Sequence, residues 1–268
     1  MEFNKGLIYK IIDNKIDKIE LYHLNEQELK TLINALKLNT SLKKINLWNS
    51  QIEDISLLCK SLKNNSCLQV LSLYNNKIEN ITPLKFLKNN SYLQKLDLSE
   101  NKIKDITSLK FLSNSCLKDL NLFFNKIKDI SSLKFLTNSC LENLNLSCNK
   151  IKDITPLKFL SNSCLEVLGL SDNQIKDITP LKFLSNSCLE VLYLNFNQIE
   201  DITPLKYLSN SCLEQLHLYE NKIKDITPLK FISNYCLQEL DLQYNQISNQ
   251  DKQKIIELAK IKQIKLCI

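Results

Sequence analysis

Cysteines and histidines are the residues of this chain whose types and spacing could support metal binding or catalysis. Six of the ten cysteines recur every 24 residues, and Cys67 holds the same place earlier. The six are Cys116, Cys140, Cys164, Cys188, Cys212 and Cys236. No cysteines have the C-x-x-C spacing of a zinc site, and the two histidines stand alone. We therefore predict no metal site and interpret the recurring cysteines as a stack of small buried side chains with reduced thiols.

The pattern does not support nucleophilic catalysis either. His217 has no serine, cysteine or aspartate partner identifiable from the sequence, and His23 belongs to the N-terminal cap. Cys148 is expected near a concave face of the fold, but a reactive thiol requires a neighbouring base or positive charge. With only two glycines in the chain, a glycine-rich phosphate loop is excluded. We predict no catalytic residue, no cofactor and no enzymatic activity, and we interpret Cys148 as a passive contact residue.

The net charge of +6 raises the question of a polyanionic partner. All 35 basic residues are lysine, whereas specific recognition of phosphate and guanine relies on the guanidinium group of arginine. One lysine row consists of Lys85, Lys110, Lys134, Lys158, Lys182, Lys206 and Lys230. Rows of glutamate and aspartate run nearby, so we expect a solvated exterior of mixed charge and argue against nucleic acid as the partner. Electrostatic binding of nucleic acid or an anionic membrane by the lysine rows is the alternative, and it predicts steep loss of binding with salt.

The element that must position these residues is a repeat, because the pattern L-x-x-L-x-L recurs ten times. The copies begin at Ile16, Leu42, Leu68, Leu93, Leu117, Leu141, Leu165, Leu189, Leu213 and Leu237. An eleventh copy, Ile261-x-x-Ile264-x-Leu266, is expected to close the chain at the same 24-residue spacing. A fixed period of this length indicates stacked supersecondary units, none of which can bury its apolar face alone. We number the positions of each repeat from its first leucine.

Each repeat divides into a short strand and a helical turn. Leu165, Leu168 and Leu170 alternate as in a strand with one buried face. The asparagine that follows, Asn173, is expected to stack with its counterparts and to satisfy backbone groups where the chain turns. The counterparts are Asn76, Asn101, Asn125, Asn149, Asn197, Asn221 and Asn245.

The outer half of the repeat begins at Thr179-Pro180. Threonine is a common N-cap and proline suits the first helical position, so a short helical turn is predicted to start there. An aromatic residue recurs in this turn, and we expect it to occupy one core layer. These aromatics are Phe86, Phe111, Phe135, Phe159, Phe183, Tyr207 and Phe231.

The combined motif, L-x-x-L-x-L-x-x-N-x-I-x-D-I-T-P-L-x-x-L, resembles the leucine-rich repeat. Its D-I-T-P-L stretch is similar to the class found in internalins and in a eukaryotic phosphatase regulatory subunit. The first helical unit, which opens at Asn25 and runs on to Leu42, resembles the longer repeats of ribonuclease inhibitor. The resemblance implies an α/β leucine-rich-repeat solenoid, with a curved, parallel inner sheet of about eleven short strands and an outer face of short helical turns.

The ends of the chain differ from the repeats, as caps of a solenoid should. Residues 1–41 are expected to form an N-terminal cap and first helical repeat, 42–248 the leucine-rich repeats, and 249–268 a C-terminal cap helix and last strand. Asn25 followed by Glu28 predicts a capped helix through Leu38. Asn249 is expected to cap a helix over residues 251–260.

Aromatic residues concentrate at positions 5, 7 and 8, which alternate with the buried leucines. We predict a partner-binding surface there, on the concave sheet. Its residues are Tyr22, Trp48, Tyr74, Phe123, Tyr193, Phe196, His217, Tyr219 and Tyr244. At position 7, exposure is expected for Tyr22, Trp48, Tyr74 and Tyr219. At position 8, we interpret Phe124, Phe196 and Tyr244 as semi-buried packing residues.

Exposed tryptophan and tyrosine are typical of protein-binding hot spots. We therefore predict a non-enzymatic scaffold that binds a protein or peptide partner on its concave sheet. A regulatory subunit that docks an enzyme is a second reading within this class. Since no secretory signal or membrane-spanning run is visible, we expect the protein in the cytoplasm, either of its own cell or of a host. We also expect it to be a monomer.

Overall fold

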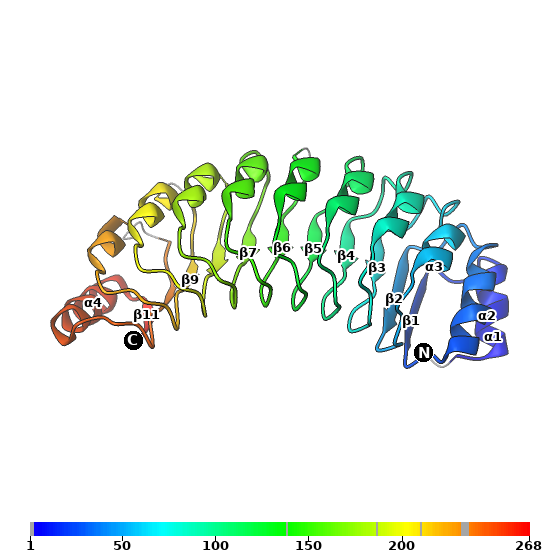
Figure 1. Cartoon of the computed structure of the whole chain (residues 1–268), viewed down its shortest axis with the longest axis horizontal. Helices are drawn as coiled ribbons and strands as arrows, with labels where there is room; N and C mark the ends of the chain where they lie inside the picture. The colour runs from blue at the N-terminus through cyan, green and yellow to red at the C-terminus, as the bar shows by residue number, and fades with distance from the viewer. Residues whose placement is uncertain (1–2, 138, 186, 210, 232–235) are drawn as a thin grey trace. The chain divides into compact units, whose positions relative to one another are not determined.

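The computed structural model of the chain describes residues 3–137, 139–185, 187–209, 211–231 and 236–268. It forms two compact units, each taken here by itself. The first comprises Met1–Ile127 and Asn138–Leu141, and the second comprises Lys128–Thr137 and Glu142–Ile268. Within each unit, parallel strands lie on one side and helical turns on the other (Figure 1). We call the sheet surface that faces away from the helical turns the strand face.

Strands of the first unit pair in parallel with the next strand along the chain. They are β1 (Lys18–Tyr22), β2 (Lys44–Trp48), β3 (Val70–Ser72), β4 (Lys95–Asp97) and β5 (Asp119–Asn121). The helical elements are α1 (Lys5–Ile12), α2 (Glu26–Leu36), α3 (Ser56–Ser61) and the 3₁₀ helices η1 (Thr82–Leu87) and η2 (Thr107–Leu112). The capping box at Asn25 and Glu28 is confirmed. Helix α1 has no counterpart among the sequence-based expectations.

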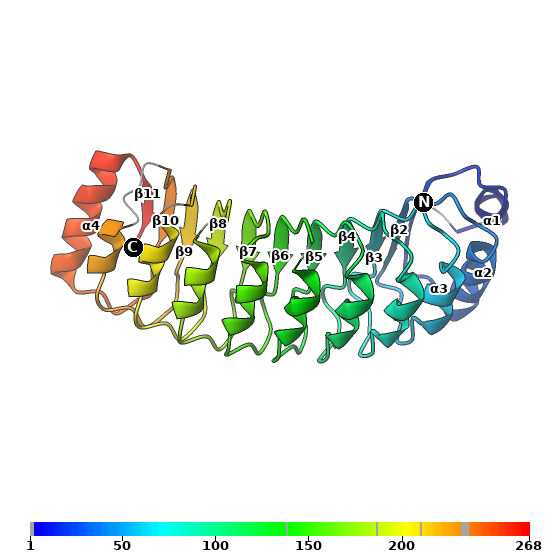
Figure 2. The ribbon, with the colours of Figure 1, turned by 90° about the horizontal axis from the view of Figure 1, so that it is seen from above.

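The second unit repeats this plan, again with parallel pairing in chain order. Its strands are β6 (Asn143–Asn145), β7 (Val167–Gly169), β8 (Val191–Tyr193), β9 (Gln215–His217), β10 (Glu239–Asp241) and β11 (Lys265–Cys267). Its helical elements are η3 (Ser131–Leu136), η4 (Thr155–Leu160), η5 (Thr179–Leu184), η6 (Thr203–Leu208), η7 (Thr227–Phe231) and α4 (Asn249–Lys262). Figure 2 shows the successive helical turns of each unit from a second direction. The predicted solenoid of strand and helical turn is confirmed.

The core of each repeat consists of the leucines at positions 1, 4 and 6 and the isoleucines that follow the asparagine. In the repeat of Leu165, the side chains of Leu165, Leu168, Leu170, Ile175 and Ile178 are fully buried. Burial of one such side chain stabilises the fold by roughly 2 kcal/mol. Because the same positions are buried in the neighbouring repeats, each repeat depends on the next to cover its apolar face.

The expected asparagine ladder is present, and Asn173 illustrates its geometry. The Nδ2 group donates to the carbonyl oxygens of Leu146, Leu170 and Ser171 at 3.0, 3.2 and 3.1 Å. The Oδ1 atom accepts from the backbone N–H of Ile151 at 2.9 Å. One buried amide therefore satisfies four backbone groups and joins two consecutive repeats. The same pattern holds at Asn76, Asn101, Asn125, Asn197, Asn221 and Asn245.

The cap of each outer turn differs from the prediction. Thr179 is the first residue of η5 rather than its cap, and its backbone N–H donates to Asp177 Oδ1 at 2.7 Å. The aspartate two residues before the turn therefore satisfies the backbone N–H of the first residue of the turn. The same bond forms at Asp105, Asp129, Asp153, Asp201 and Asp225. This row of aspartates therefore has a structural role, in addition to offsetting the positive charge of the lysines.

Two side-chain rows expected in the core lie at the surface instead. The recurring aromatics of the outer turns are half-buried, Tyr207 is 38% exposed, and the Phe231 side chain lies outside the described part. A lysine ammonium covers each described ring, as Lys182 does over Phe183 at 5.2 Å from the centroid. Cys236 is half-buried and the other cysteines of its row are exposed. The aromatics lie within the 3₁₀ turns and the cysteines directly before the first leucine of each repeat, and in both rows the side chain points to solvent while the next leucine is buried.

The C-terminal cap also differs in detail. Ser248, not Asn249, is the N-cap of α4, because its Oγ accepts from the backbone N–H of Asp251 at 3.1 Å. Helix α4 continues to Lys262, two residues past its expected end, so the last strand also begins later. Leu266 therefore pairs with Leu240 instead of following the predicted 24-residue register. Ile261, expected in the core of an eleventh copy, lies in α4 and is 77% exposed.

Candidate partner-binding surface

Position 8 of the repeat has a left-handed backbone, and the aromatic side chains at this position lie in solvent. Phe124, Phe196 and Tyr244 have φ angles of 51°, 53° and 55°. Their exposed fractions are 59%, 45% and 72%, so the prediction of semi-buried packing is wrong for all three. A left-handed residue at the end of the strand reverses the chain before it enters the next turn, which directs its side chain away from the core. Asn49 and Asn75 occupy the same position, and asparagine suits this conformation far better than an aromatic residue does.

In the first unit, Tyr22, Trp48 and Tyr74 line the ends of successive strands. Tyr22 is exposed, as expected, whereas Trp48 and Tyr74 are half-buried. The Trp48 indole Nε1 donates to Ser72 Oγ at 2.9 Å, and the Tyr74 hydroxyl donates to Glu100 Oε1 at 3.1 Å. The second bond raises the pKa of Tyr74 above its ordinary value. Both rings therefore have their polar atoms satisfied inside the chain and present their apolar surfaces outward.

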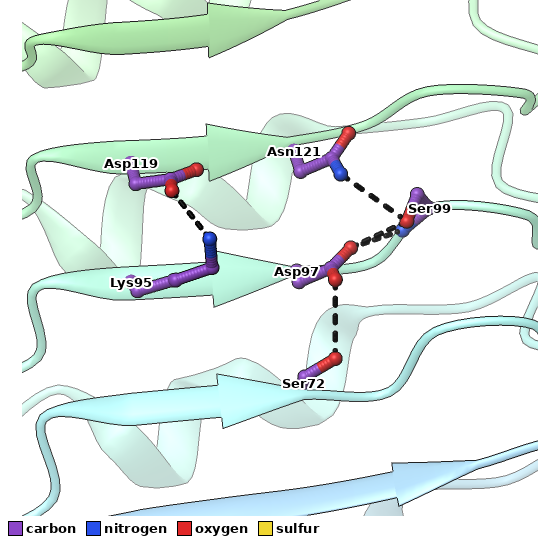
Figure 3. Close-up of polar contacts among 6 residues, drawn as sticks. All are labelled: Ser72, Lys95, Asp97, Ser99, Asp119 and Asn121. Atoms are coloured by element: carbon purple, nitrogen blue, oxygen red, sulfur yellow. Dashed lines mark hydrogen bonds and ion pairs between the residues drawn. The ribbon is translucent and has the colours of Figure 1, made fainter.

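Ser72, which accepts the hydrogen bond from Trp48, belongs to a polar network across β3, β4 and β5, and Figure 3 shows this network. Ser72 Oγ donates to Asp97 Oδ2 at 3.1 Å, and Asp97 Oδ1 accepts from the backbone N–H of Ser99 at 3.0 Å. The Asn121 amide donates to Ser99 Oγ at 3.3 Å. The sequence analysis did not identify this network of Ser72, Asp97, Ser99 and Asn121. The signal was available, because Ser72 at position 5 lies one strand from Trp48 at position 7.

Phe123 stands apart from that network, at the end of β5. It is half-buried, and its ring centroid lies 6.0 Å from that of the exposed Phe124. Its backbone N–H donates to Asn121 Oδ1 at 3.1 Å. The predicted binding residue Phe123 therefore forms an aromatic pair with Phe124, which sequence reasoning had placed among the packing residues.

In the second unit, five predicted site residues form two aromatic groups. The ring of Tyr193 stacks on His217 with a centroid separation of 4.9 Å and an interplanar angle of 24°. Tyr219 contacts Phe196 at 4.9 Å and Tyr244 at 5.1 Å, both edge to face. Burial raises the pKa of Tyr219 above its ordinary value, and Glu220 adds to the shift. We call Tyr193, Phe196, His217, Tyr219 and Tyr244 the aromatic band.

His217 has neighbours that sequence spacing alone did not identify. It pairs in register with Tyr193 on β8 and with Asp241 on β10. Its Nε2 atom is buried and has no hydrogen-bond partner among the described residues. Across the described ranges of the chain, no three histidine, cysteine, aspartate or glutamate side chains are arranged to hold a metal ion. His217 therefore contributes an aromatic surface to the band, not a ligand set.

Cys148, at position 8, is expected to be a slow nucleophile. Burial, with a contribution from Asp172, raises the pKa of its thiol to about 11. A smaller fraction of Cys148 is then thiolate at pH 8. A thiolate of higher pKa is intrinsically more nucleophilic, but this offsets only part of the loss. Alkylation of Cys148 should therefore be about tenfold slower than alkylation of an exposed thiol. Timed labelling with iodoacetamide at pH 8, read by peptide mass spectrometry against exposed Cys164, measures this. Asp172→Asn should speed Cys148 alone, and equal rates for the two cysteines in the unchanged protein would contradict the expectation.

The described helices include none with the length and apolar character needed to cross a membrane.

Comparison with known proteins identifies the family to which the repeat belongs. The model described as leucine-rich repeats (2 copies) matches residues 40–86, 68–111, 91–135, 117–159, 164–207 and 189–231, and a single-repeat model matches 233–251. An internalin (inlF) of Listeria monocytogenes is 27% identical, with a TM-score of 0.69 over 97% of this chain and 82% of that one. Internalin C2 of the same organism is 29% identical, with a TM-score of 0.59 over 81% and 84%.

A leucine-rich-repeat protein of Leptospira interrogans shares the fold at 22% identity, with a TM-score of 0.69 over 94% of this chain and 72% of its own. No curated protein matches the chain in sequence. Leucine-rich repeats generally act as protein-interaction scaffolds. The family models cover most of the chain, and the internalin structures share its repeat. The chain therefore belongs to the leucine-rich-repeat family, and its repeats are internalin-like.

Proposed function

We propose that the strand face binds a protein or peptide partner, through the aromatic band of the second unit and through Tyr22, Trp48, Tyr74 and Phe123 of the first. The observation that carries the proposal is the exposure of Phe196 and Tyr244 in left-handed conformations. That conformation costs a non-glycine residue about 1–2 kcal/mol. Exposed rings recover little of this by packing in the free protein. Because every repeat has a left-handed residue at position 8, the conformation itself belongs to the fold, and the exposed aromatic surface is the feature typical of a binding site.

Preorganisation of the first-unit residues supports the same function. The hydrogen bonds from Trp48 to Ser72 and from Tyr74 to Glu100 restrict both side chains before any partner arrives. A side chain that is already ordered loses less conformational entropy on binding, by about 0.5–1.5 kcal/mol each. A partner can therefore bury these rings at a lower entropic cost than it would with freely rotating side chains.

An affinity pull-down from source-cell lysate, at low and high salt, tests the proposal. We expect the unchanged protein to retain a specific partner protein at high salt. Trp48→Ala/Tyr74→Ala or Tyr219→Ala/Tyr244→Ala should reduce its capture at least about tenfold, as truncation of hot-spot residues does. The matched control is Tyr9→Ala/Tyr92→Ala, which removes two exposed tyrosines that lie off the strand face and should leave capture unchanged.

The outcome that contradicts the proposal is specific. Nucleic acid or mixed anionic species, captured by every variant and lost only as salt rises, would assign binding to the lysine rows instead. Circular dichroism of each variant separates lost binding from lost folding. Trp48→Phe gives a second check, because it keeps an aromatic ring and removes only the hydrogen bond to Ser72.

A further inference from the structure

The strand face of the second unit carries a charge opposite to that of the whole chain. In the repeats that begin at Leu141, Leu165, Leu189, Leu213 and Leu237, positions 2, 3, 5, 7 and 8 include eight carboxylates and no lysine. The eight are Glu142, Glu166, Asp172, Glu190, Glu214, Glu220, Glu239 and Asp241. In the five earlier repeats, the same positions carry five acidic residues and five lysines. Negative charge is therefore concentrated beside the aromatic band, in a chain whose net charge is +6.

Three of the carboxylates at position 2 form no ion pair with a lysine in the described part of the chain. We call Glu166, Glu190 and Glu214, which share position 2, the acidic row. They lie at equivalent places in successive repeats, because the backbone N–H of Glu190 donates to the carbonyl oxygen of Glu166 and that of Glu214 to the carbonyl oxygen of Glu190, both at 2.8 Å. Within the described residues, no lysine forms an ion pair with any of the three. Like charges on neighbouring rungs repel one another, so a cationic partner would relieve an unfavourable interaction.

The other charged groups on strands β8 to β11 are already engaged or add to the negative field. Lys265 on β11 forms an ion pair with Glu239 at 2.9 Å, and this contact holds the pKa of the Glu239 carboxyl below its ordinary value. Asp241 accepts a hydrogen bond from the backbone N–H of Gln243 at 3.1 Å. Asp172 interacts with the Cys148 thiol. The one lysine of these strands is thus neutralised locally and leaves the acidic row uncompensated.

The acidic row and the aromatic band lie close enough to contact one ligand. Positions 2 and 5 of a strand are about 10 Å apart, so Glu190 lies roughly that far from Tyr193, and Glu214 from His217. The faces of aromatic rings attract cations as carboxylates do. A lysine or arginine side chain of a partner would be attracted by both the acidic row and the aromatic band, whereas a phosphate group would be repelled by both.

We infer that the aromatic band and acidic row of the second unit bind a basic segment of a protein. Lysine or arginine side chains of the segment face Glu166, Glu190 and Glu214, and its apolar side chains cover Tyr219 and Tyr244. The inference rests on the proposed function and specifies the chemistry of the partner. Charge complementarity selects this occupant over a polyanion or an acidic peptide.

The test pans a library of random 12-residue peptides against the full chain and measures the affinity of the selected peptides by fluorescence anisotropy. We expect selected sequences to be enriched in lysine and arginine and to contain at least one apolar or aromatic residue. Glu190→Gln/Glu214→Gln should weaken their binding about tenfold at low salt, with a smaller effect as salt rises. The matched control is Glu200→Gln/Glu257→Gln, which removes the same charge from exposed glutamates away from the band.

The possible results separate this inference from the proposed function. If peptides bind and Tyr219→Ala/Tyr244→Ala abolishes binding, but the peptides are not basic or Glu190→Gln/Glu214→Gln has no effect, the surface is a binding site and the basic partner is wrong. Selection of acidic peptides, or of no peptide, also overturns the inference. Failure of the proposed function would instead appear as partner capture that is indifferent to every aromatic substitution.

Discussion

Asn173→Ala is expected to lower the free energy of unfolding by about 2–4 kcal/mol, which is a large effect for one exchange of a polar residue. The substitution leaves the backbone N–H of Ile151 without an acceptor and removes a donor from the carbonyl oxygens of Leu146, Leu170 and Ser171. These groups lie where water does not compensate, because Asn173 is only 7% exposed. Alanine cannot replace either half of the amide.

Urea unfolding followed by circular dichroism measures this loss, and hydrogen exchange at Ile151 locates it. Asn195→Ala is the matched control, since Asn195 lies on the strand face and its Oδ1 atom has no hydrogen-bond partner within the described ranges. The control should change stability by less than about 0.5 kcal/mol. If the two variants unfold at the same urea concentration, the asparagine ladder does not stabilise the repeat as we describe.

Leu168→Ala is expected to destabilise the protein by about 3 kcal/mol, within the usual range for a buried leucine. Leu168 is fully buried at the centre of β7 and pairs in register with Leu144 and Leu192. Truncation removes apolar surface from the core and leaves a cavity that rigid neighbouring repeats cannot readily fill. Since each repeat is stabilised through its interfaces, the effect should extend to both adjacent repeats.

The same unfolding measurement applies, with Val167→Ala as the control on the same strand. Val167 is half-buried on the strand face, so its truncation should cost less than about 1 kcal/mol. A comparable loss from both variants would mean that the strand face is packed as tightly as the core. That result would also weaken the case for a binding surface there.

Repetition explains why so much of the fold could be predicted. When one residue type recurs at a fixed spacing, each copy must occupy the same environment, so one repeat predicts the others. Leu165, Leu168 and Asn173 were assigned correctly for this reason, and the capped helix at Asn25 followed from its local capping motif. The limits placed at residues 41/42 and 248/249 stay predictions.

Periodicity was a poor guide at the corners of the repeat and at its last copy. Cys164 recurs as regularly as Leu165, yet it is exposed, because periodicity reveals equivalence but not the direction in which a side chain points. Leu266 was placed in the wrong register, since the length of α4 depends on how its end packs and not on the repeat.

The candidate site divides in the same way. The sequence by itself determined which aromatic residues lie at positions 5, 7 and 8, and also the negative charge of the later repeats, because both follow from counting along a fixed period. Only the tertiary structure decided that Tyr244 is exposed and that Trp48 is held by Ser72. Exposure depends on a backbone dihedral angle, and the hydrogen bond joins residues on neighbouring strands. Neither is determined until the repeats are packed against one another.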